Sequence, residues 1–169
     1  AMRSSLVGSE MCIRDSFGDM AKANDQGYFP YTPAVTLLRG LRTSIDMLLD
    51  EGLDNVSARH ARLATGVRAA VDAWGLRNCA RRPELYSDTV TAIMVDPSFN
   101  ANDIIGAAYS HFGVSLGGGL GKVAGKVFRI GHLGWLNEAM VLQALGGAEL
   151  AMRHCGVEFR AVSYTHLLA

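Results

Sequence analysis

The chain has 169 residues, of which 49% are hydrophobic and 19% are charged, as expected for a globular protein with a single core. Its 16 Lys and Arg residues balance its 16 Asp and Glu residues, so the formal net charge is zero. Without a basic excess or a basic block to neutralise phosphates, nucleic acid is not an expected partner. No run of about 18 apolar residues occurs, so no membrane partner is expected either.

The two ends of the chain differ in character from the rest. Residues 3–16 resemble translated sequencing-adapter read-through, and residues 161–167 resemble the matching sequence at the other end. We therefore predict that segments 1–16 and 161–169 are artefactual tails; the alternative is that they are native, poorly ordered termini. In both cases, Cys12 and His166 are not candidates for a functional site.

The three cysteines, Cys12, Cys79 and Cys155, are odd in number and far apart, without a Cys-x-x-Cys spacing. This usage favours a reduced, intracellular protein, which we expect to be cytoplasmic. His154 precedes Cys155, but no two further ligands lie at a usable spacing, so no metal site is expected.

The first part of the chain is expected to be a polar lead-in segment at residues 17–27, which lacks apolar periodicity, followed by a stiff aromatic and proline-rich stretch. Thr32 is a candidate N-cap and Pro33 suits the first turn of a helix that runs to about residue 51. Tyr28, Tyr31 and Thr32 can therefore form a capped helix entry. Alternatively, their hydroxyl groups form an anion- or ligand-binding edge at the helix start.

A second helix is predicted after an N-cap at Asp54 or Asn55, and it ends at Gly75. His60 lies on or beside its apolar stripe, and a histidine there is more often a partly buried packing residue than a catalyst. The arginines of this helix are interpreted as a solvated face: Arg59, Arg62 and Arg68. The expected apolar stripe consists of Val56, His60, Leu63, Val67, Val71 and Trp74.

The rest of the chain alternates short strands with two helices. The expected order is two strands, a helix, two strands and a helix, at residues 76–80, 89–95, 100–112, 114–116, 127–131 and 137–155. Such a mixed order predicts an α+β fold, in which helices cover one face of a small, mainly antiparallel sheet.

Arg129 is the most informative single residue, because it lies in the middle of the apolar strand 127–131 and follows the glycine-rich run 115–122. Three interpretations compete. The arginine can point to the wet face of the sheet, pair with a buried carboxylate, or project into a cleft and bind an anion bidentately. The glycines favour the cleft, because backbone without a Cβ can approach a ligand closely, but they do not decide the question.

The glycine-rich run 115–122 and the residues around it match none of the known phosphate-binding or catalytic motifs. The Walker A pattern lacks its first glycine and its hydroxyl residue. The dinucleotide pattern lacks a following helix in a parallel unit. A nucleophile elbow and a Ser-His-Asp triad are also absent.

The stretch from Gly27 to Glu158 resembles the C-terminal part of the class-V pyridoxal-phosphate-dependent aminotransferases of fold type I. Within that family it is most similar to the serine–glyoxylate and alanine–glyoxylate aminotransferases. The resemblance covers most of the chain in order, and it is carried by the phrases at residues 27–33, 37–42, 51–56, 58–63, 73–76, 89–92, 115–117 and, with the highest specificity, 119–134.

This resemblance implies roles for a few residues. Arg129 matches the arginine that pairs with the α-carboxylate of the substrate. Thr32 matches a threonine that reaches the cofactor phosphate of the neighbouring subunit. A family tyrosine does the same, but Phe29 stands at its aligned position here, and Tyr28 and Tyr31 on either side are the candidates for this role. The full-length protein is therefore expected to be a homodimer that binds pyridoxal 5'-phosphate, with amino-acid and keto-acid substrates, in the cytoplasm or in the peroxisome of a eukaryote.

The family's catalytic lysine and the other main cofactor contacts lie in an N-terminal large domain to which nothing here corresponds. Lys22, Lys122 and Lys126 do not lie in the lysine motif, so no residue is assigned as catalytic. The resemblance implies that 17–33 leads in from the large domain and that 34–160 is the C-terminal small domain with its leading interdomain helix.

The implied activity is transfer of an amino group from serine, or from alanine or aspartate, to glyoxylate to give glycine, and the fragment alone is expected to be inactive. The alternative is a stand-alone α+β domain that binds a small ligand or a partner without catalysis. A cysteine desulfurase or related class-V lyase shares the architecture but lacks the serine–glyoxylate phrases.

Overall fold

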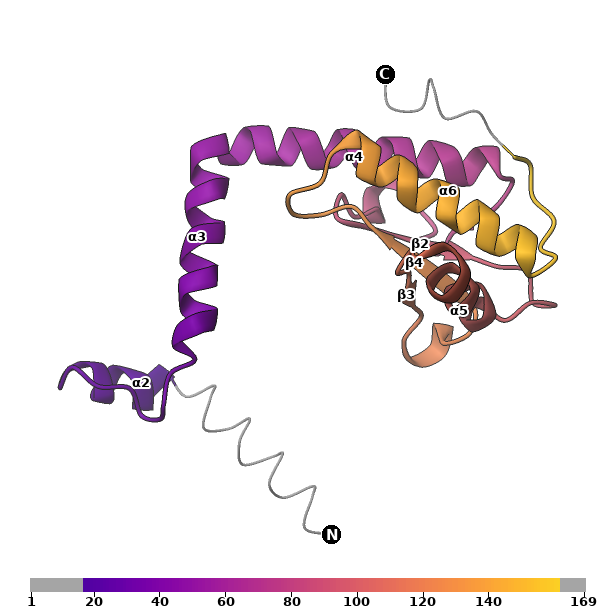
Figure 1. The fold of residues 1–169 in the computed structure, drawn as a ribbon. Helices are drawn as coiled ribbons and strands as arrows, with labels where there is room; N and C mark the ends of the chain where they lie inside the picture. Colours follow the sequence, from indigo (N-terminus) through magenta and orange to yellow (C-terminus); the bar gives the residue numbers. More distant parts are fainter. Residues whose placement is uncertain (1–16, 162–169) are drawn as a thin grey trace, which may run out of the picture. The chain divides into compact units, whose positions relative to one another are not determined.

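The structure is a computed structural model that describes residues 17–161, so most of both predicted tails lies outside the described residues. The chain divides into two compact units at the boundary between Asp50 and Glu51, and each is described by itself. Figure 1 shows the elements of both units along the chain.

The first unit contains two helices, α2 (Phe17–Asn24) and α3 (Val35–Glu51). Helix α2 was not predicted: with eight residues and no buried side chain, it is too short and too polar to show an apolar period. Its first turn carries Asp19 and its last turn carries Lys22, an order that favours a helix through the backbone dipole.

Helix α3 ends where the sequence predicts but begins two residues later than expected. Its first residue is Val35, so Thr32 is not the N-cap, and the aromatic and proline-rich segment 27–33 is non-helical as predicted. Many apolar side chains of this helix are exposed, namely Val35, Leu37, Leu38, Leu41, Ile45, Met47 and Leu49.

The second unit is built on a four-stranded sheet of β1 (Arg77–Asn78), β2 (Val90–Met94), β3 (Gly117–Gly118) and β4 (Val127–Gly131). The strand order is β1-β2-β4-β3, and every neighbouring pair is antiparallel. The predicted α+β class with an antiparallel sheet is therefore confirmed, and β4 has the predicted bounds.

Strand β3 differs from the prediction, which had placed a strand at residues 114–116. Val114 and Leu116 are buried in the hydrophobic core instead, and the pairing with β4 is made by the two glycines that follow. The apolar residues indicated burial correctly but not strand pairing.

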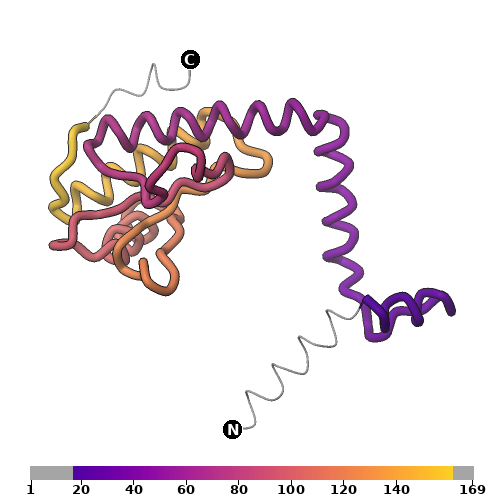
Figure 2. The backbone as a smooth tube through the Cα atoms, turned by 180° about the vertical axis from the view of Figure 1, so that it is seen from behind, coloured from indigo at the N-terminus to yellow at the C-terminus, as the bar shows by residue number. Residues whose placement is uncertain are grey.

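Three helices complete this unit: α4 (Leu53–Ala73), α5 (Ala101–Phe112) and α6 (Glu138–His154). Two short 3-10 turns lie at Pro83–Leu85 and Gly121–Val123. Along the chain, α4 is followed by the short strand β1 and then by β2. Figure 2 traces the backbone from behind, coloured by residue number.

Asparagine side chains cap helices α5 and α6, whereas the N-cap predicted for α4 at Asp54 or Asn55 is wrong. The side chain of Asn100 accepts a hydrogen bond from the Asn102 backbone N–H, and that of Asn137 accepts one from Met140. At α4 the N-cap position is Gly52, and Asn55 donates its side-chain amide to the Glu51 carbonyl at 2.8 Å instead.

The core lies between the helices and one face of the sheet. Alternate residues of β2 and β4 point into it, and Ile93, Phe128 and Ile130 are at most 2% exposed. Helix residues complete this core, among them Leu63, Val67, Val71, Trp74, Ile104, Leu145 and Met152. The helices thus cover one face of the sheet and leave the alternate residues of β4 facing the other way.

Replacing Asn137 by alanine removes the acceptor at the start of α6 and should lower the free energy of unfolding by about 1 kcal/mol. Chemical unfolding of the 169-residue chain measures this change. Asn137→Ser keeps a hydroxyl acceptor and should retain most of the stability; equal losses in both variants would contradict the capping role.

Candidate functional site

Arg129 lies in the middle of β4, on the face of the sheet opposite the helix core. Its partner residue on β2 is Ala92, and its partner on β3 is Gly117. Cys79 extends the same row beyond Ala92, because its backbone N–H donates to the Ala92 carbonyl at 2.8 Å. The arginine is therefore flanked by the two smallest residue types, so neighbouring side chains leave it room.

The Arg129 side chain has no ion pair and no hydrogen bond within residues 17–161. Its Nε is fully enclosed by protein, and it is the one buried side-chain nitrogen or oxygen of the described residues without a hydrogen-bond partner. Of the three interpretations of this arginine, pairing with a buried carboxylate of the described chain is thus wrong. A cation without a partner remains available to an anion from outside.

The stem of Arg129 packs directly on the backbone of Gly117. A Cβ at Gly117 would lie 3.2 Å from Arg129 Nε, 3.3 Å from its Cβ and 3.5 Å from Nη2. The sequence indicated that glycines allow close approach but did not identify this contact, because it depends on the register between β3 and β4.

Gly119 has a different role from Gly117. A Cβ there would lie 2.1 Å from the Val123 carbonyl oxygen, so any side chain would collide with the backbone of the turn that leads to β4. This glycine shapes the loop, whereas Gly117 contacts the arginine.

The hollow next to this row has a volume of about 340 Å³. It lies on the Ala92 side of the row and is lined also by Cys79, Tyr86 and Val90. Arg68 reaches it as well, with its guanidinium 5.6 Å from the centre of the Tyr86 ring. The free thiol of Cys79 thus lies in the same row as Arg129, one strand beyond Ala92.

His132, directly after β4, is completely buried and has two hydrogen-bond partners. Its Nδ1 lies 3.1 Å from the Asp88 carbonyl oxygen, which can only accept, so Nδ1 carries the proton. Its Nε2 then accepts from the Thr91 hydroxyl at 2.8 Å. Burial lowers the pKa of His132 below its usual value, so the ring is neutral and links the end of β4 to β2.

Of the three arginines of α4 that were predicted to form a solvated face, Arg62 is exposed as predicted, whereas Arg59 and Arg68 are partly buried. Arg59 binds both carboxylate oxygens of Glu51 at 2.7 and 2.8 Å, and its Nη1 donates to the carbonyls of Gly134 and Leu136. The hydrogen bond from Arg59 is the main reason why the pKa of Glu51 is lowered. The partners of Arg59 lie 8 to 77 positions away in the sequence, so the periodicity of α4 could not reveal these contacts.

The other two arginines of α4 are also paired. Arg62 forms an ion pair with Glu138 at the start of α6, and Arg68 forms one with Asp88 at 3.3 Å. His60, interpreted as a packing residue, is partly buried and accepts a hydrogen bond from the Gly134 backbone N–H at 3.1 Å. Together with Arg59, these contacts fix the loop that follows β4.

The residues expected at the cofactor phosphate lie in the first unit. Tyr28 is 72% exposed, Thr32 is exposed and Tyr31 is partly buried. The hydroxyl groups of Tyr28 and Thr32 are therefore accessible on the non-helical segment before α3.

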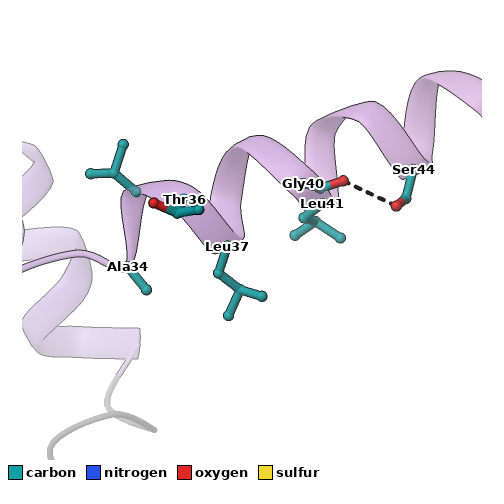
Figure 3. A pocket seen from close by; sticks show the side chains of 7 residues that line it. Ala34, Thr36, Leu37, Gly40, Leu41 and Ser44 are labelled. Carbon is teal, nitrogen blue, oxygen red and sulfur yellow. Dashed lines mark hydrogen bonds between the residues drawn. The ribbon is translucent and has the colours of Figure 1, made fainter.

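A hollow of about 790 Å³ runs along α3 (Figure 3). Seven residues from Ala34 to Ser44 line it, and none of them is charged. The Ser44 hydroxyl donates to the Gly40 carbonyl at 3.0 Å, so it is occupied within the helix. This surface is suited to packing rather than to chemistry.

No group of three or more His, Cys, Asp or Glu side chains between residues 17 and 161 is arranged to hold a metal ion. No helix in this range combines the length and the hydropathy that crossing a bilayer requires.

The fold matches the C-terminal part of fold-type-I aminotransferases. Pyridoxamine–pyruvate aminotransferase from Mesorhizobium loti superimposes with a TM-score of 0.73 at 35% identity, over 78% of this chain and 34% of that one. Ureidoglycine–glyoxylate aminotransferase from Bacillus subtilis gives the same TM-score at 26% identity, over 82% of this chain and 35% of that one. No protein-family model matches the sequence.

Comparison with curated sequences shows which aminotransferases this chain resembles in sequence. The chain is 61% identical to the serine–glyoxylate aminotransferase of Hyphomicrobium methylovorum over 150 residues, 89% of this chain and 37% of that protein. It is 55% identical to the L-aspartate–glyoxylate aminotransferase of Paracoccus denitrificans, over 82% of this chain and 35% of that protein. The chain is therefore a homologue of the serine–glyoxylate and aspartate–glyoxylate aminotransferases, and it spans about a third of their length.

Titration of His132 should make the fold less stable in mild acid. The unfolded histidine has a pKa near 6.5, whereas burial lowers it in the folded state, so between these values the unfolded chain binds more protons. Stability should be fully present above about pH 6.5 and should fall as the pH drops through this window.

Urea unfolding of the 169-residue chain at pH 7.5 and 5.5 measures this effect, with His132→Gln as the non-titrating variant. The variant should be less stable at pH 7.5 but should lose less stability on acidification. An unchanged pH dependence in His132→Gln would show that other groups cause it.

Proposed function

We propose that this chain is the C-terminal part of a pyridoxal-phosphate-dependent aminotransferase that moves an amino group from serine, or from alanine or aspartate, to glyoxylate, giving glycine. Its relatives from Hyphomicrobium and Paracoccus are named for serine or aspartate as donor and glyoxylate as acceptor. The observation that carries the proposal is the unpaired guanidinium of Arg129 on the open face of the sheet. Donor and acceptor share one feature that this group recognises, a carboxylate next to the reacting carbon.

In this proposal, Arg129 binds the α-carboxylate of the substrate. A guanidinium presents a planar pair of donors that matches a carboxylate, and such charged hydrogen bonds are among the strongest in proteins. Because the arginine extends from the centre of a paired strand, it can fix the orientation of the bound substrate as well as its affinity. The cofactor, when bound, supplies the ring that accepts the electron pair released at the substrate Cα.

The proposed domain organisation follows from the same relationship. Residues 34–160 form the C-terminal small domain with α3 as its leading interdomain helix, and residues 17–33 lead in from a large domain that carries the catalytic lysine. The exposed apolar side chains of α3 support this organisation, because such a surface is usually covered by another part of a protein.

We also propose that Thr32, with Tyr28 or Tyr31, binds the phosphate of pyridoxal 5'-phosphate held mainly by the large domain of a neighbouring subunit. The accessible hydroxyls of Thr32 and Tyr28 fit a phosphate, which accepts hydrogen bonds from such groups. The whole enzyme is then a homodimer, since each cofactor contacts residues of both subunits.

A chimera tests the role of Arg129. The matching C-terminal segment of the Hyphomicrobium enzyme is replaced by residues 17–160 of this chain, and serine–glyoxylate transamination is measured. Arg129→Ala should reduce kcat/KM for serine by at least about tenfold, mainly by raising KM, because a charged hydrogen bond contributes about 1.5–3 kcal/mol. Arg129→Lys should recover little, since a lysine lacks the planar fork.

Two controls accompany this experiment. Arg153→Ala changes an exposed arginine on α6 and should leave the kinetics unaltered. The 169-residue chain alone should have no transaminase activity. Wild-type kinetics in Arg129→Ala would remove Arg129 from the substrate site.

The phosphate contact is tested in the same chimera by Thr32→Val, which keeps the shape of the side chain and removes the hydroxyl. The dissociation constant for pyridoxal 5'-phosphate should rise by about tenfold, as for a lost hydrogen bond to a charged group. Tyr28→Phe and Tyr31→Phe should differ from one another, and the variant with weaker cofactor binding identifies the tyrosine. Unchanged affinity in all three variants would contradict the phosphate site.

A further inference from the structure

We propose that Gly117 is a positioning residue for Arg129: its missing side chain lets the arginine stem lie against the β3 backbone, and this contact sets the direction of the guanidinium. The inference rests on the proposed function of Arg129 as the carboxylate-binding residue. It adds a second residue, on a neighbouring strand, that controls how well the site binds its substrate.

The register of the sheet places the two residues side by side. Gly117 is the direct partner of Arg129 across the β3–β4 pair, so a side chain at either position would point to the same face. The added Cβ at Gly117 would lie 3.2 Å from Nε and 3.3 Å from Cβ of Arg129, which is tighter than most Cβ contacts, so the arginine side chain would have to shift. The same close packing agrees with the complete enclosure of Nε.

Backbone conformation does not explain the glycine at position 117. Gly117 is not among the glycines with positive φ, so an alanine is compatible with its backbone. The three atoms nearest to a Cβ at Gly117 all belong to the Arg129 side chain. The cost of a methyl group would therefore fall on the position of the guanidinium rather than on the loop.

The adjacent Gly118 provides a matched control. It pairs with Phe128 and faces the helix side of the sheet, where a Cβ would lie 3.6 Å from Ile105 Cδ1, an ordinary van der Waals contact. Two neighbouring glycines of the same two-residue strand thus differ in one respect: only the first lies on the Arg129 face.

The test uses the chimera described above, with variants Gly117→Ala, Gly118→Ala, Arg129→Ala and the double variant Gly117→Ala/Arg129→Ala. The readouts are kcat and KM for serine, the inhibition constant of acetate, and the midpoint of thermal unfolding. Acetate reports carboxylate binding alone, because it has no amino group to react.

Gly117→Ala should raise both KM and the acetate inhibition constant by about tenfold, because displacing a positioning group by a fraction of 1 Å weakens the clamp. Its kcat should change much less. Gly118→Ala should stay within about twofold of the parent, as expected for ordinary packing. In the Arg129→Ala background, adding Gly117→Ala should cause no further loss, since the group through which it acts is gone.

The outcomes separate the two proposals. If Arg129→Ala itself leaves acetate binding intact, the proposed function of the arginine fails. If Arg129→Ala weakens binding but Gly117→Ala behaves like Gly118→Ala, the role of Gly117 is overturned and that of Arg129 stands. An equal effect of Gly117→Ala with and without Arg129 would show a general structural role and would also overturn the inference.

A further measurement uses no variant at position 117, so it tests the inference even if Gly117→Ala does not fold. In the 169-residue chain labelled with ¹⁵N-arginine, the Arg129 Nε–H signal, assigned by its loss in Arg129→Lys, should exchange with water at least about tenfold more slowly than that of the exposed Arg153, because Nε is enclosed. Equally fast exchange would show that Gly117 does not hold the arginine stem, and the inference would fail.

Discussion

The central constraint in this domain is a cation held in the middle of a paired strand. Arg129 has sheet partners on both sides, Ala92 and Gly117, and neither offers it a polar side chain. Its backbone is fixed by two ladders of hydrogen bonds, so the only freedom left belongs to the side chain. Packing on Gly117 then removes part of that freedom before any ligand arrives.

The other face of the sheet makes this arrangement rigid. Phe128 and Ile130 flank the arginine in sequence and are buried against the helices, which prevents β4 from rotating or shifting its register. His132 ties the end of the strand to Thr91 and Asp88, and Arg59 holds the loop beyond it. A binding group on a rigid element is placed more precisely than one on a free loop.

The sequence predicted the parts of this structure that depend on local signals. Strand β4 is bounded by glycines, and helices α5 and α6 begin with asparagine caps, so their limits were correct. Helix α2 is too short for a period to be visible, and β3 contains no residue with strand preference. The ion pair of Arg68 joins residues 20 positions apart, and such contacts depend on the tertiary fold, which one sequence cannot reveal.

The roles assigned to individual residues rest on different grounds. The resemblance pointed to Arg129, whereas the contact with Gly117 became visible only from the strand register. The roles of Thr32, Tyr28 and Tyr31 depend on a neighbouring subunit and stay predictions.

The enclosed Nε of Arg129 also affects the stability of the domain. A buried N–H without a partner costs about 1–3 kcal/mol, so an aliphatic residue of similar length would make the isolated domain more stable. Variants selected only for resistance to heat would therefore discard this arginine early, and its presence records selection for something other than folding.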